Sequence, residues 1–239
     1  MAGKFYGIGV GPGDPELLTL KACRILKDVD VLAIPKSRRE RRSIALEIVA
    51  QAVEKEWQIK ELLLPMTQDL AELKKHWKKA SQEILELLND GKDVAFVTLG
   101  DPTIYSTFTY LMKGVKELAP DVKVEIVPGI SAINAMSAWV QKPLSEGDEN
   151  LAVIPAIRSG DEIKLLLERF DNLVLMKAGK QFKKVYEVLK ETGLDKKATF
   201  ISRCGFSDGF YTENLEELED KNLDYLSSIL IKKNSGGEE

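Results

Sequence analysis

The chain has 239 residues, enough for one large α/β domain or two smaller ones. Its 34 basic and 38 acidic residues give a net charge of −4, so no overall positive field favours nucleic acid or an anionic membrane. Two cysteines without metal-ligand spacing and a single histidine, His76, argue against a zinc site or a histidine triad. With no long apolar run and no signal-peptide pattern, we expect no metal, no membrane partner and a cytoplasmic location.

In the first half, short apolar runs alternate with longer amphipathic stretches, which is typical of parallel strands joined by helices. The expected strands are residues 5–10, 29–34, 59–64, 94–99 and 124–127. Helices are expected to begin near Pro15, Ser43, Asp69 and Ile104, with Asp14 as the N-cap before Pro15. This half is therefore predicted to form a parallel sheet.

The second half predicts strands at 151–154, 173–176, 199–202 and 228–231, with helices at 161–170 and 181–192. Turn residues flanked by aromatic residues at 205–211 favour a hairpin, which would make this sheet mixed. The predicted fold class is α/β with two αβα domains, residues 1–130 and 131–233, followed by a disordered tail at 234–239. The polar segment 143–150 is an alternative boundary.

The first strand runs into a glycine-rich turn, Gly7-Ile8-Gly9-Val10-Gly11-Pro12-Gly13-Asp14. It lacks the third glycine of the dinucleotide fingerprint and the Gly-Lys-Ser/Thr of a phosphate loop. An acidic residue, Asp14, also stands where a helix N-terminus would otherwise attract a phosphate. The turn therefore favours a neutral or cationic ligand, the alternative being a tight connection that binds nothing.

Two further strands end in motifs of the same kind, Gly100-Asp101-Pro102-Thr103-Ile104-Tyr105-Ser106-Thr107 and Val127-Pro128-Gly129-Ile130-Ser131-Ala132. Taken singly, Asp101 before Pro102 and Ser131 after Gly129 could each be a plain helix cap. Parallel strands place their carboxyl ends on one edge of the sheet, which is where open α/β sheets bind ligands. Together the motifs predict a ligand site at that edge.

The three motifs, from Gly7 to Ala22, Gly100 to Thr107 and Val127 to Ala132, resemble the tetrapyrrole methylases. That family includes uroporphyrinogen methyltransferase, the corrin-ring methyltransferases and diphthine synthase. Residues 100–108 together with Ala-Ile-Pro-Lys-Ser-Arg at 33–38 are most similar to the precorrin-2 or cobalt-factor II C20-methyltransferases. The resemblance implies methylation of carbon C20 of a tetrapyrrole precursor of vitamin B12.

The resemblance also implies a homodimer that holds S-adenosyl-L-methionine, the methyl donor, between its two domains and releases S-adenosyl-L-homocysteine. Matched residue by residue, it implies cofactor contacts from Val10, Pro12, Gly100, Asp101, Ile104, Ser131, Ala132, Met176, Cys204, Gly205 and Ser228. For Met176, which ends an expected strand, an ordinary place in the core is an equal alternative.

Methyl transfer from a sulfonium needs neither a metal nor an enzyme nucleophile, in keeping with the single histidine. We expect no indispensable general base, with Tyr105 or Asp101 as the catalytic candidates nearest the reaction. The substrate carries carboxylates, and at least one of Arg38, Arg41 and Arg42 is expected to bind one of them. The alternative for this basic run is a solvated loop.

The sequence leaves other functions open. One scaffold serves several ring positions, so a different precorrin or uroporphyrinogen methyltransferase is an alternative. A non-catalytic ligand-binding module on the same scaffold is another. An RNA-binding protein would rest on the arginine run with Trp57 or Trp77, without an aromatic platform to match. Whether the substrate carries cobalt is not decided by any ligand cluster in the sequence.

Overall fold

The computed structural model describes residues 2–36, 43–67, 69–155 and 159–233. The chain folds into two compact units, Met1–Ser131 and Ala132–Glu239. The boundary expected from the sequence falls one residue earlier, between residues 130 and 131. The tail at 234–239, expected to be disordered, lies outside the described residues, and the expected place of the cofactor between the domains stays a prediction.

The first unit is built on a five-stranded sheet in which every paired strand is parallel. The strand order is β3-β2-β4-β1-β5. The strands are β1 (Phe5–Gly9), β2 (Val31–Lys36), β3 (Gln58–Leu63), β4 (Val94–Thr98) and β5 (Val124–Val127). The predicted parallel sheet is confirmed.

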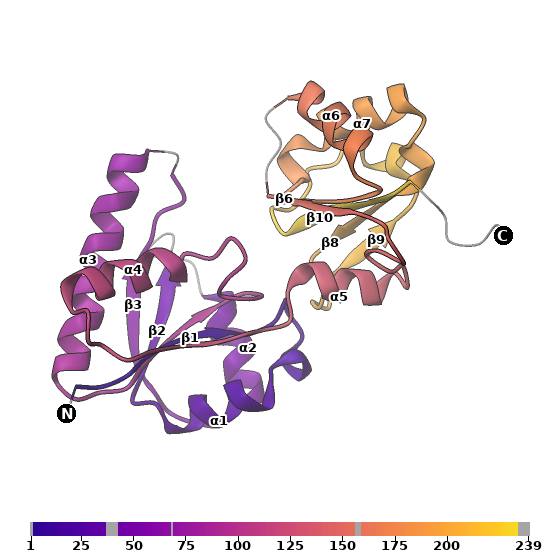
Figure 1. Cartoon of the computed structure of the whole chain (residues 1–239). Helices are drawn as coiled ribbons and strands as arrows, with labels where there is room; N and C mark the ends of the chain where they lie inside the picture. The colour runs from indigo at the N-terminus through magenta and orange to yellow at the C-terminus, as the bar shows by residue number, and fades with distance from the viewer. Residues whose placement is uncertain (1, 37–42, 68, 156–158, 234–239) are drawn as a thin grey trace. The chain divides into compact units, whose positions relative to one another are not determined.

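Helices cover both faces of this sheet (Figure 1). On one face α1 (Leu20–Asp28) and α2 (Ile44–Ala52) pack on Ile8, Leu32 and Val97. On the other face α3 (Leu70–Asn89) and α4 (Phe108–Leu118) pack on Phe5 and Phe96. The neighbouring strands β1 and β4 therefore lead into helices on opposite faces. Such a switch point opens a crevice at the carboxyl ends of the two strands.

Two helix starts differ from the sequence prediction. Asp14 does cap a helix at Pro15, but it is only the 3₁₀ helix η1 (Pro15–Leu17); Leu18 is extended, and α1 begins after its own N-cap, Thr19. The helix expected near Ile104 begins four residues later, at Phe108. The cause is the carboxylate of Asp101, which holds the chain in a turn instead of starting a helix.

The second unit has a mixed five-stranded sheet with the order β6-β7-β10-β8-β9. Its strands are β6 (Leu151–Ile154), β7 (Asn172–Met176), β8 (Ala198–Ser202), β9 (Phe210–Thr212) and β10 (Ser227–Lys232). Only β6 and β7 pair in parallel, and the other neighbours are antiparallel. The hairpin expected at 205–211 is formed by β8 and β9, so the predicted mixed sheet is confirmed.

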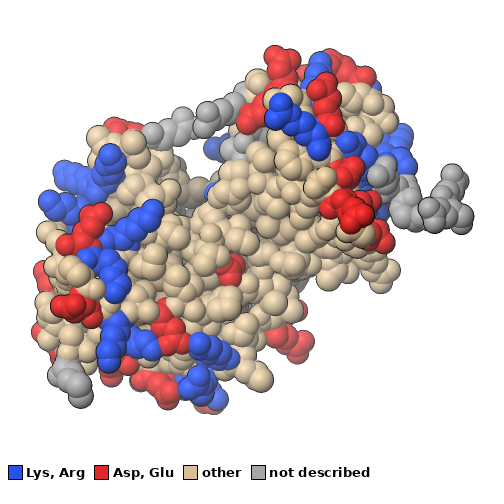
Figure 2. Space-filling model, viewed as in Figure 1, with Lys and Arg blue, Asp and Glu red and all other residues tan. Residues whose placement is uncertain are grey.

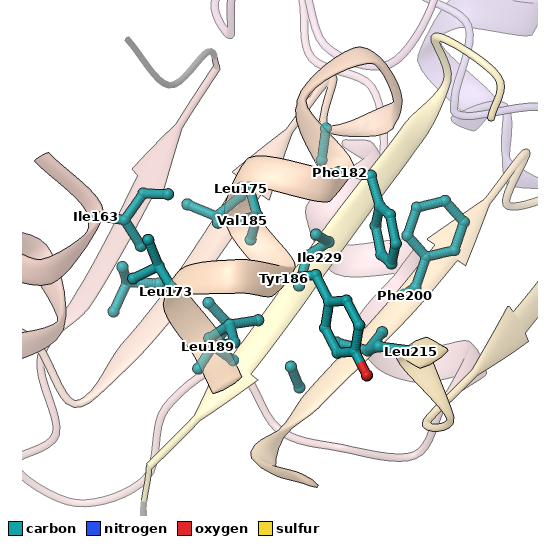
Figure 3. Packing of buried hydrophobic residues seen from close by; sticks show 14 of the residues in the cluster. Ile163, Leu173, Leu175, Phe182, Val185, Tyr186, Leu189, Phe200, Leu215 and Ile229 are labelled. Carbon is teal, nitrogen blue, oxygen red and sulfur yellow. The ribbon is translucent and has the colours of Figure 1, made fainter. Parts of the chain in front are cut away.

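The main core of the second unit lies under α6 (Gly160–Arg169) and α7 (Phe182–Thr192), where Phe182, Phe200 and Ile229 are buried (Figure 3). Three short 3₁₀ helices, η2 (Gly179–Gln181), η3 (Asp195–Lys197) and η4 (Leu215–Leu218), connect the larger elements. The opposite face is covered by α5 (Ala132–Trp139), which the sequence analysis did not predict. Ile133 and Met136 of α5 pack on Val174, Ile201 and Leu230.

Candidate functional site at the carboxyl edge of the first sheet

The loops after β1 and β4 are joined to each other through their backbones. The amide of Val10 donates to the carbonyl of Thr98 (3.0 Å), and Gly11 and Gly100 exchange hydrogen bonds of 3.3 and 2.7 Å. Gly11 and Gly100 both have positive φ angles, 80° and 71°, which side chains other than glycine rarely adopt. These glycines let the two strand ends continue as one short antiparallel bridge beyond the parallel sheet.

The loop after β5 is packed against the same point. A Cβ on Gly129 would lie 2.3 Å from the carbonyl oxygen of Gly100 and 2.7 Å from the carbonyl carbon of Gly9. A Cβ on Gly9 would lie 2.5 Å from the same Gly100 oxygen. All three distances are far below van der Waals contact, so only glycine lets the three loops approach this closely. We call this arrangement of Gly9, Gly100 and Gly129 the glycine junction.

Asp101 holds the junction together with its carboxylate. Its Oδ1 accepts hydrogen bonds from the amide (2.7 Å) and the hydroxyl (2.5 Å) of Thr103, and its Oδ2 accepts one from the amide of Gly129 (2.9 Å). The side chain is buried, with 8% of its surface exposed. Hydrogen bonds to a carboxylate are stronger than those between neutral groups. Asp101 therefore fixes the loop after β4 to the loop after β5 and is not a helix cap.

Beyond Asp101 the loop turns its side chains outward. Thr103, Ile104 and Tyr105 are exposed, and Tyr105 is held at φ 50°, a conformation that is costly for a side chain with a Cβ. The next residue, Ser106, is buried; its hydroxyl lies 3.0 Å from that of Thr98 and accepts a hydrogen bond from the amide of Phe108 at the start of α4. The loop thus presents Ile104 and Tyr105 from a backbone that is fixed at both ends.

The remaining candidates of the first loop and of the β5 loop lie at the same edge. Val10 and Pro12 are buried. Ser131 is buried and directly precedes α5, while Ala132 is half-buried as the first residue of that helix. The first unit therefore brings Val10, Pro12, Gly100, Asp101 and Ile104 to one sheet edge, as the motif order predicts.

In the second unit, Met176 and Ser228 are direct cross-strand partners on β7 and β10. Met176 and Cys204 both pack on the cluster under α5, and Ser228 lies two residues before Leu230 of the same cluster. Strand residues two apart share a face, so Met176, Cys204 and Ser228 lie on the α5 side of this sheet. Gly205 follows with a φ of 85°. Burial raises the pKa of the Cys204 thiol to about 11, so the sulfur is a neutral contact at neutral pH and not a nucleophile.

The arginine run is the part of the predicted site that cannot be placed. Arg38, Arg41 and Arg42 lie outside the described residues. Lys36, the last residue of β2, is described and pairs with Leu63, the last residue of β3. Lys36, two residues before Arg38 in the sequence, therefore lies at the carboxyl ends of β2 and β3.

Two contributors to this edge are not apparent from the sequence motifs. Gly129 is the packing partner of Gly9 and Gly100, which its place in a motif does not show. The hydroxyl of Ser106 supports the start of α4, and its position after a tight turn is the capping signal that could have found it. Within the ranges that the structure describes, no three His, Cys, Asp or Glu side chains are grouped to hold a metal ion. Nor is any helix there long and apolar enough to cross a membrane.

Comparison with known proteins adds an independent line of evidence. Residues 4–219 match the model of the tetrapyrrole (corrin/porphyrin) methylases. The chain is 42% identical over 235 residues to a probable cobalt-precorrin-2 C(20)-methyltransferase of Methanocaldococcus jannaschii, covering 96% of each chain. It is 33% identical to the cobalt-precorrin-2 C(20)-methyltransferase of Salmonella typhimurium, covering 98% of each. The uroporphyrin-III C-methyltransferase of Thermus thermophilus, solved with S-adenosylhomocysteine, has the same fold (TM-score 0.66, 22% identity, 97% and 92% of the two chains).

Proposed function

Because the chain belongs to the tetrapyrrole methylases, we propose that it methylates carbon C20 of cobalt-factor II or precorrin-2, using S-adenosyl-L-methionine, in cobalamin biosynthesis. Two full-length relatives, at 42% and 33% identity, carry the name of this activity with the cobalt-containing substrate. The observation that carries the proposal is the glycine junction, at the switch point between β1 and β4. Fold alone would not select the reaction.

The residues at the junction fit the proposed cofactor. The three loops, residues 9–14, 99–107 and 127–132, contain no Lys or Arg, so nothing in them repels a positively charged sulfonium. Their glycines let backbone pack directly on backbone, which fixes the three loops at this edge. Asp14 caps η1 with its side chain and keeps a negative charge beside the first loop, which disfavours a phosphate. A cationic cofactor without phosphates suits this edge.

The chemistry requires positioning more than proton transfer. When bound, S-adenosyl-L-methionine would supply an electrophilic methyl group for in-line attack by a nucleophilic ring carbon, with S-adenosyl-L-homocysteine as the leaving thioether. Asp101 is a positioning residue in this scheme, because its carboxylate already accepts three hydrogen bonds from the protein. Ile104 and Tyr105 project from the fixed loop and can orient the reactants. Cys204, with its neutral thiol, contributes contact area only.

For the substrate, we propose that at least one of Arg38, Arg41 and Arg42 binds a carboxylate bidentately. The support is their position directly after β2, whose carboxyl end belongs to the edge with the glycine junction. Replacing Arg38 and Arg42 by Ala should raise the KM for the tetrapyrrole and leave the cofactor Kd unchanged. Unchanged kinetics would remove this assignment.

The test of the proposed function has two steps. Calorimetry with S-adenosyl-L-methionine and S-adenosyl-L-homocysteine measures cofactor binding, and incubation with cobalt-factor II or with precorrin-2 is followed by mass spectrometry and NMR of the product. We expect one added methyl group, at C20. Binding of the cofactor without any methylated product would favour a non-catalytic ligand-binding module. A methyl group on another ring carbon would show a different regiospecificity.

We propose further that the protein is a homodimer located in the cytoplasm, as the family resemblance implies. Light scattering of the purified chain gives its mass in solution, and a monomer across the working concentration range would contradict the dimer. Cell fractionation tests the location.

A further inference from the structure

Four of the predicted cofactor contacts belong to one end of the second sheet, where β7 and β8 end and β10 begins. Met176 and Ser228 lie in the strands themselves, whereas Cys204 and Gly205 follow directly after β8. These last two belong to the hairpin loop, residues 203–209, which connects β8 to β9. A loop lacks the ladder of hydrogen bonds that fixes a strand. The positions of Cys204 and Gly205 therefore depend on the contacts that hold the hairpin loop.

Arg203 is the first residue of the hairpin loop, and its backbone is held in an unfavourable conformation. Its φ angle is 50°, in the left-handed region that side chains with a Cβ rarely adopt. Its amide donates to the carbonyl of Leu226 (2.9 Å), and its carbonyl accepts from the amide of Phe206 (3.0 Å). The chain thus turns sharply as it leaves β8, and other contacts must stabilise this turn.

The guanidinium of Arg203 makes three contacts that can do so. Its Nε donates to Oδ1 of Asp208 at 2.8 Å, and its Cζ lies 4.6 Å from the centroid of the Phe206 ring. A terminal nitrogen lies 3.8 Å from a carboxylate oxygen of Asp224, which precedes β10. The hydrogen bond from Arg203 also lowers the pKa of Asp208, because it stabilises the charged carboxylate. Arg203 thus ties the hairpin loop together and faces the segment that leads to Ser228.

The groups on the β10 side of Arg203 are fixed in turn. Oδ1 of Asp224 accepts a hydrogen bond of 2.7 Å from the amide of Leu226. Next to it, the hydroxyl of Ser227 donates to that of Ser202 at 3.1 Å, which joins the start of β10 to the end of β8. Because two carboxylates surround the one guanidinium, this cluster adds no net positive charge that would repel a sulfonium.

An ion pair on this surface is not by itself a sign of function. Figure 2 shows acidic and basic side chains mixed on the visible face of the second unit. Lys190 of α7, for example, pairs with Glu219 at 2.8 Å and lies 4.4 Å from the centroid of the Tyr186 ring. Exposed pairs of this kind contribute little to stability. Arg203 differs because its planar guanidinium makes three contacts at once, within the loop that carries two predicted cofactor contacts.

We propose that Arg203 is a positioning residue for the methyl donor: its guanidinium orders the hairpin loop, and with it Cys204 and Gly205, before the cofactor binds. The inference rests on the proposed function for the identity of the cofactor. A loop that is already ordered does not have to be fixed during binding, so loss of the guanidinium should weaken cofactor binding without changing the chemical step.

The first test is Arg203→Met, which keeps an aliphatic stem and removes the guanidinium. Calorimetry should show the Kd of S-adenosyl-L-homocysteine raised about threefold to tenfold, and that of S-adenosyl-L-methionine raised by the same factor. A purely electrostatic role would separate the two values, because only S-adenosyl-L-methionine carries the sulfonium charge. In the activity assay, the KM for S-adenosyl-L-methionine should rise while kcat stays within about twofold of the parent value.

Hydrogen exchange of the ligand-free protein tests the ordering of the loop directly. The amides of Phe206 and Gly209 each donate a hydrogen bond of 3.0 Å inside the hairpin loop. Both should exchange faster in Arg203→Met, because the loop opens more often. Arg203→Lys keeps the charge and loses the planar contacts, so its cofactor Kd and exchange rates should lie between those of the parent chain and Arg203→Met.

The matched control is Lys190→Met, because Lys190 makes the same two kinds of contact, an ion pair and a ring contact, away from the hairpin loop. It should keep the cofactor Kd and both exchange rates, and its Tm should be similar to that of Arg203→Met. An unchanged Kd in Arg203→Met, or an equal weakening in Lys190→Met, would overturn the inference. A parent chain that binds S-adenosyl-L-homocysteine but forms no methylated product would count only against the proposed function, so the two failures are distinguishable.

Discussion

The carboxylate of Asp101 accepts a hydrogen bond of 2.9 Å from the backbone amide of Gly129. The bond joins the end of β4 to the end of β5, although β1 lies between these strands in the sheet. Because Asp101 is buried and the same carboxylate also accepts from Thr103, the loops after β4 and β5 are fixed to each other. Because these loops are ordered before a ligand arrives, binding there does not carry the entropy cost of ordering them.

Asp101→Asn should loosen this edge. The side-chain oxygen of the Asn can still accept from Thr103. Its NH₂ group would then face the backbone N–H of Gly129, so that two donors oppose each other. We expect a loss of about 1–3 kcal/mol in the free energy of unfolding of the first unit and weaker cofactor binding. Chemical denaturation and calorimetry with S-adenosyl-L-homocysteine measure both.

The matched control is Asp69→Asn, in which the same chemical change falls on the N-cap of α3, whose carboxylate accepts from the amides of Ala71 and Glu72. Asn and Asp cap helices about equally well, so this variant should keep both stability and affinity. If Asp101→Asn behaved like the control, the proposed role of Asp101 as a positioning residue would be wrong.

Gly129→Ala tests the glycine junction itself. The added Cβ would meet the backbone of Gly100 at 2.3 Å, and backbone cannot rotate away as a side chain does. We expect about 1–3 kcal/mol of destabilisation and loss of cofactor binding. Gly147→Ala is the control, since its Cβ has no atom within 4 Å and only its φ of 52° is unfavourable. That variant should lose some stability, as measured by thermal unfolding, with its cofactor Kd unchanged.

The sheet architecture is predictable from the sequence because buried strands are short and apolar and their period differs from that of the helices. The element α5 escaped because its eight residues are too few for a clear helical period and carry no charge to mark an outer face. The start of α4 was misplaced because Asp101-Pro102 is also an N-cap signal. In the folded chain the Asp101 carboxylate instead accepts bonds from Thr103 and from Gly129, a residue distant in sequence.

For the site, the sequence predicts the location but not the detailed contacts. The order of the three motifs is enough to bring Val10, Gly100 and Ser131 toward one edge, because parallel strands end together. The contact distances between Gly9, Gly100 and Gly129 were not predictable, since they depend on the register of three strands.

The thiol of Cys204 should react slowly with iodoacetamide at neutral pH. Burial raises its pKa from 9.0 to about 11, so almost all of it is protonated there and the thiolate appears only as the pH approaches 11. A group whose pKa is raised by folding stabilises the fold below its unfolded pKa. This contribution is lost as the pH rises from 9.0 through about 11.

Peptide mass spectrometry separates alkylation of Cys204 from that of Cys23. Cys204→Ala should keep methyl transfer. Its free energy of unfolding should no longer show the decrease that the Cys204 thiol causes between pH 9.0 and about 11. Rapid alkylation of Cys204 at pH 7, or an inactive Cys204→Ala that still binds the cofactor, would contradict its role as a neutral contact.

At the other end of the first sheet, Glu125 on β5 is paired with two lysines. Lys21 of α1 lies 2.6 Å from its carboxylate, and Lys4 also donates to it. These bonds, that of Lys21 first, lower the pKa of Glu125 from 4.5 to about 2. A lowered pKa contributes stability above the unfolded value, so the contribution should be lost as the pH falls from 4.5 to about 2.

Glu125→Gln should therefore be less stable than the parent chain at pH 7, by about 1 kcal/mol because the pair is still reached by solvent. The difference should shrink toward pH 2, as followed by urea denaturation at each pH. Glu117→Gln, on an exposed position of α4, is the control and should show no such convergence. A difference that stayed constant down to pH 2 would disprove the assignment.

Tyr105→Phe decides whether the reaction uses a general base at the tip of the β4 loop. The substitution keeps the ring and the φ of 50°, and removes only the hydroxyl of a side chain that is half exposed. Since displacement at a sulfonium by an electron-rich ring carbon requires no prior proton removal, we expect kcat to fall by less than about tenfold, below the range typical of a lost general base. The pH profile of kcat should keep its shape. A loss of about a hundredfold or more, accompanied by the disappearance of a limb of the pH profile, would make Tyr105 a catalytic residue and show that proton transfer limits the reaction.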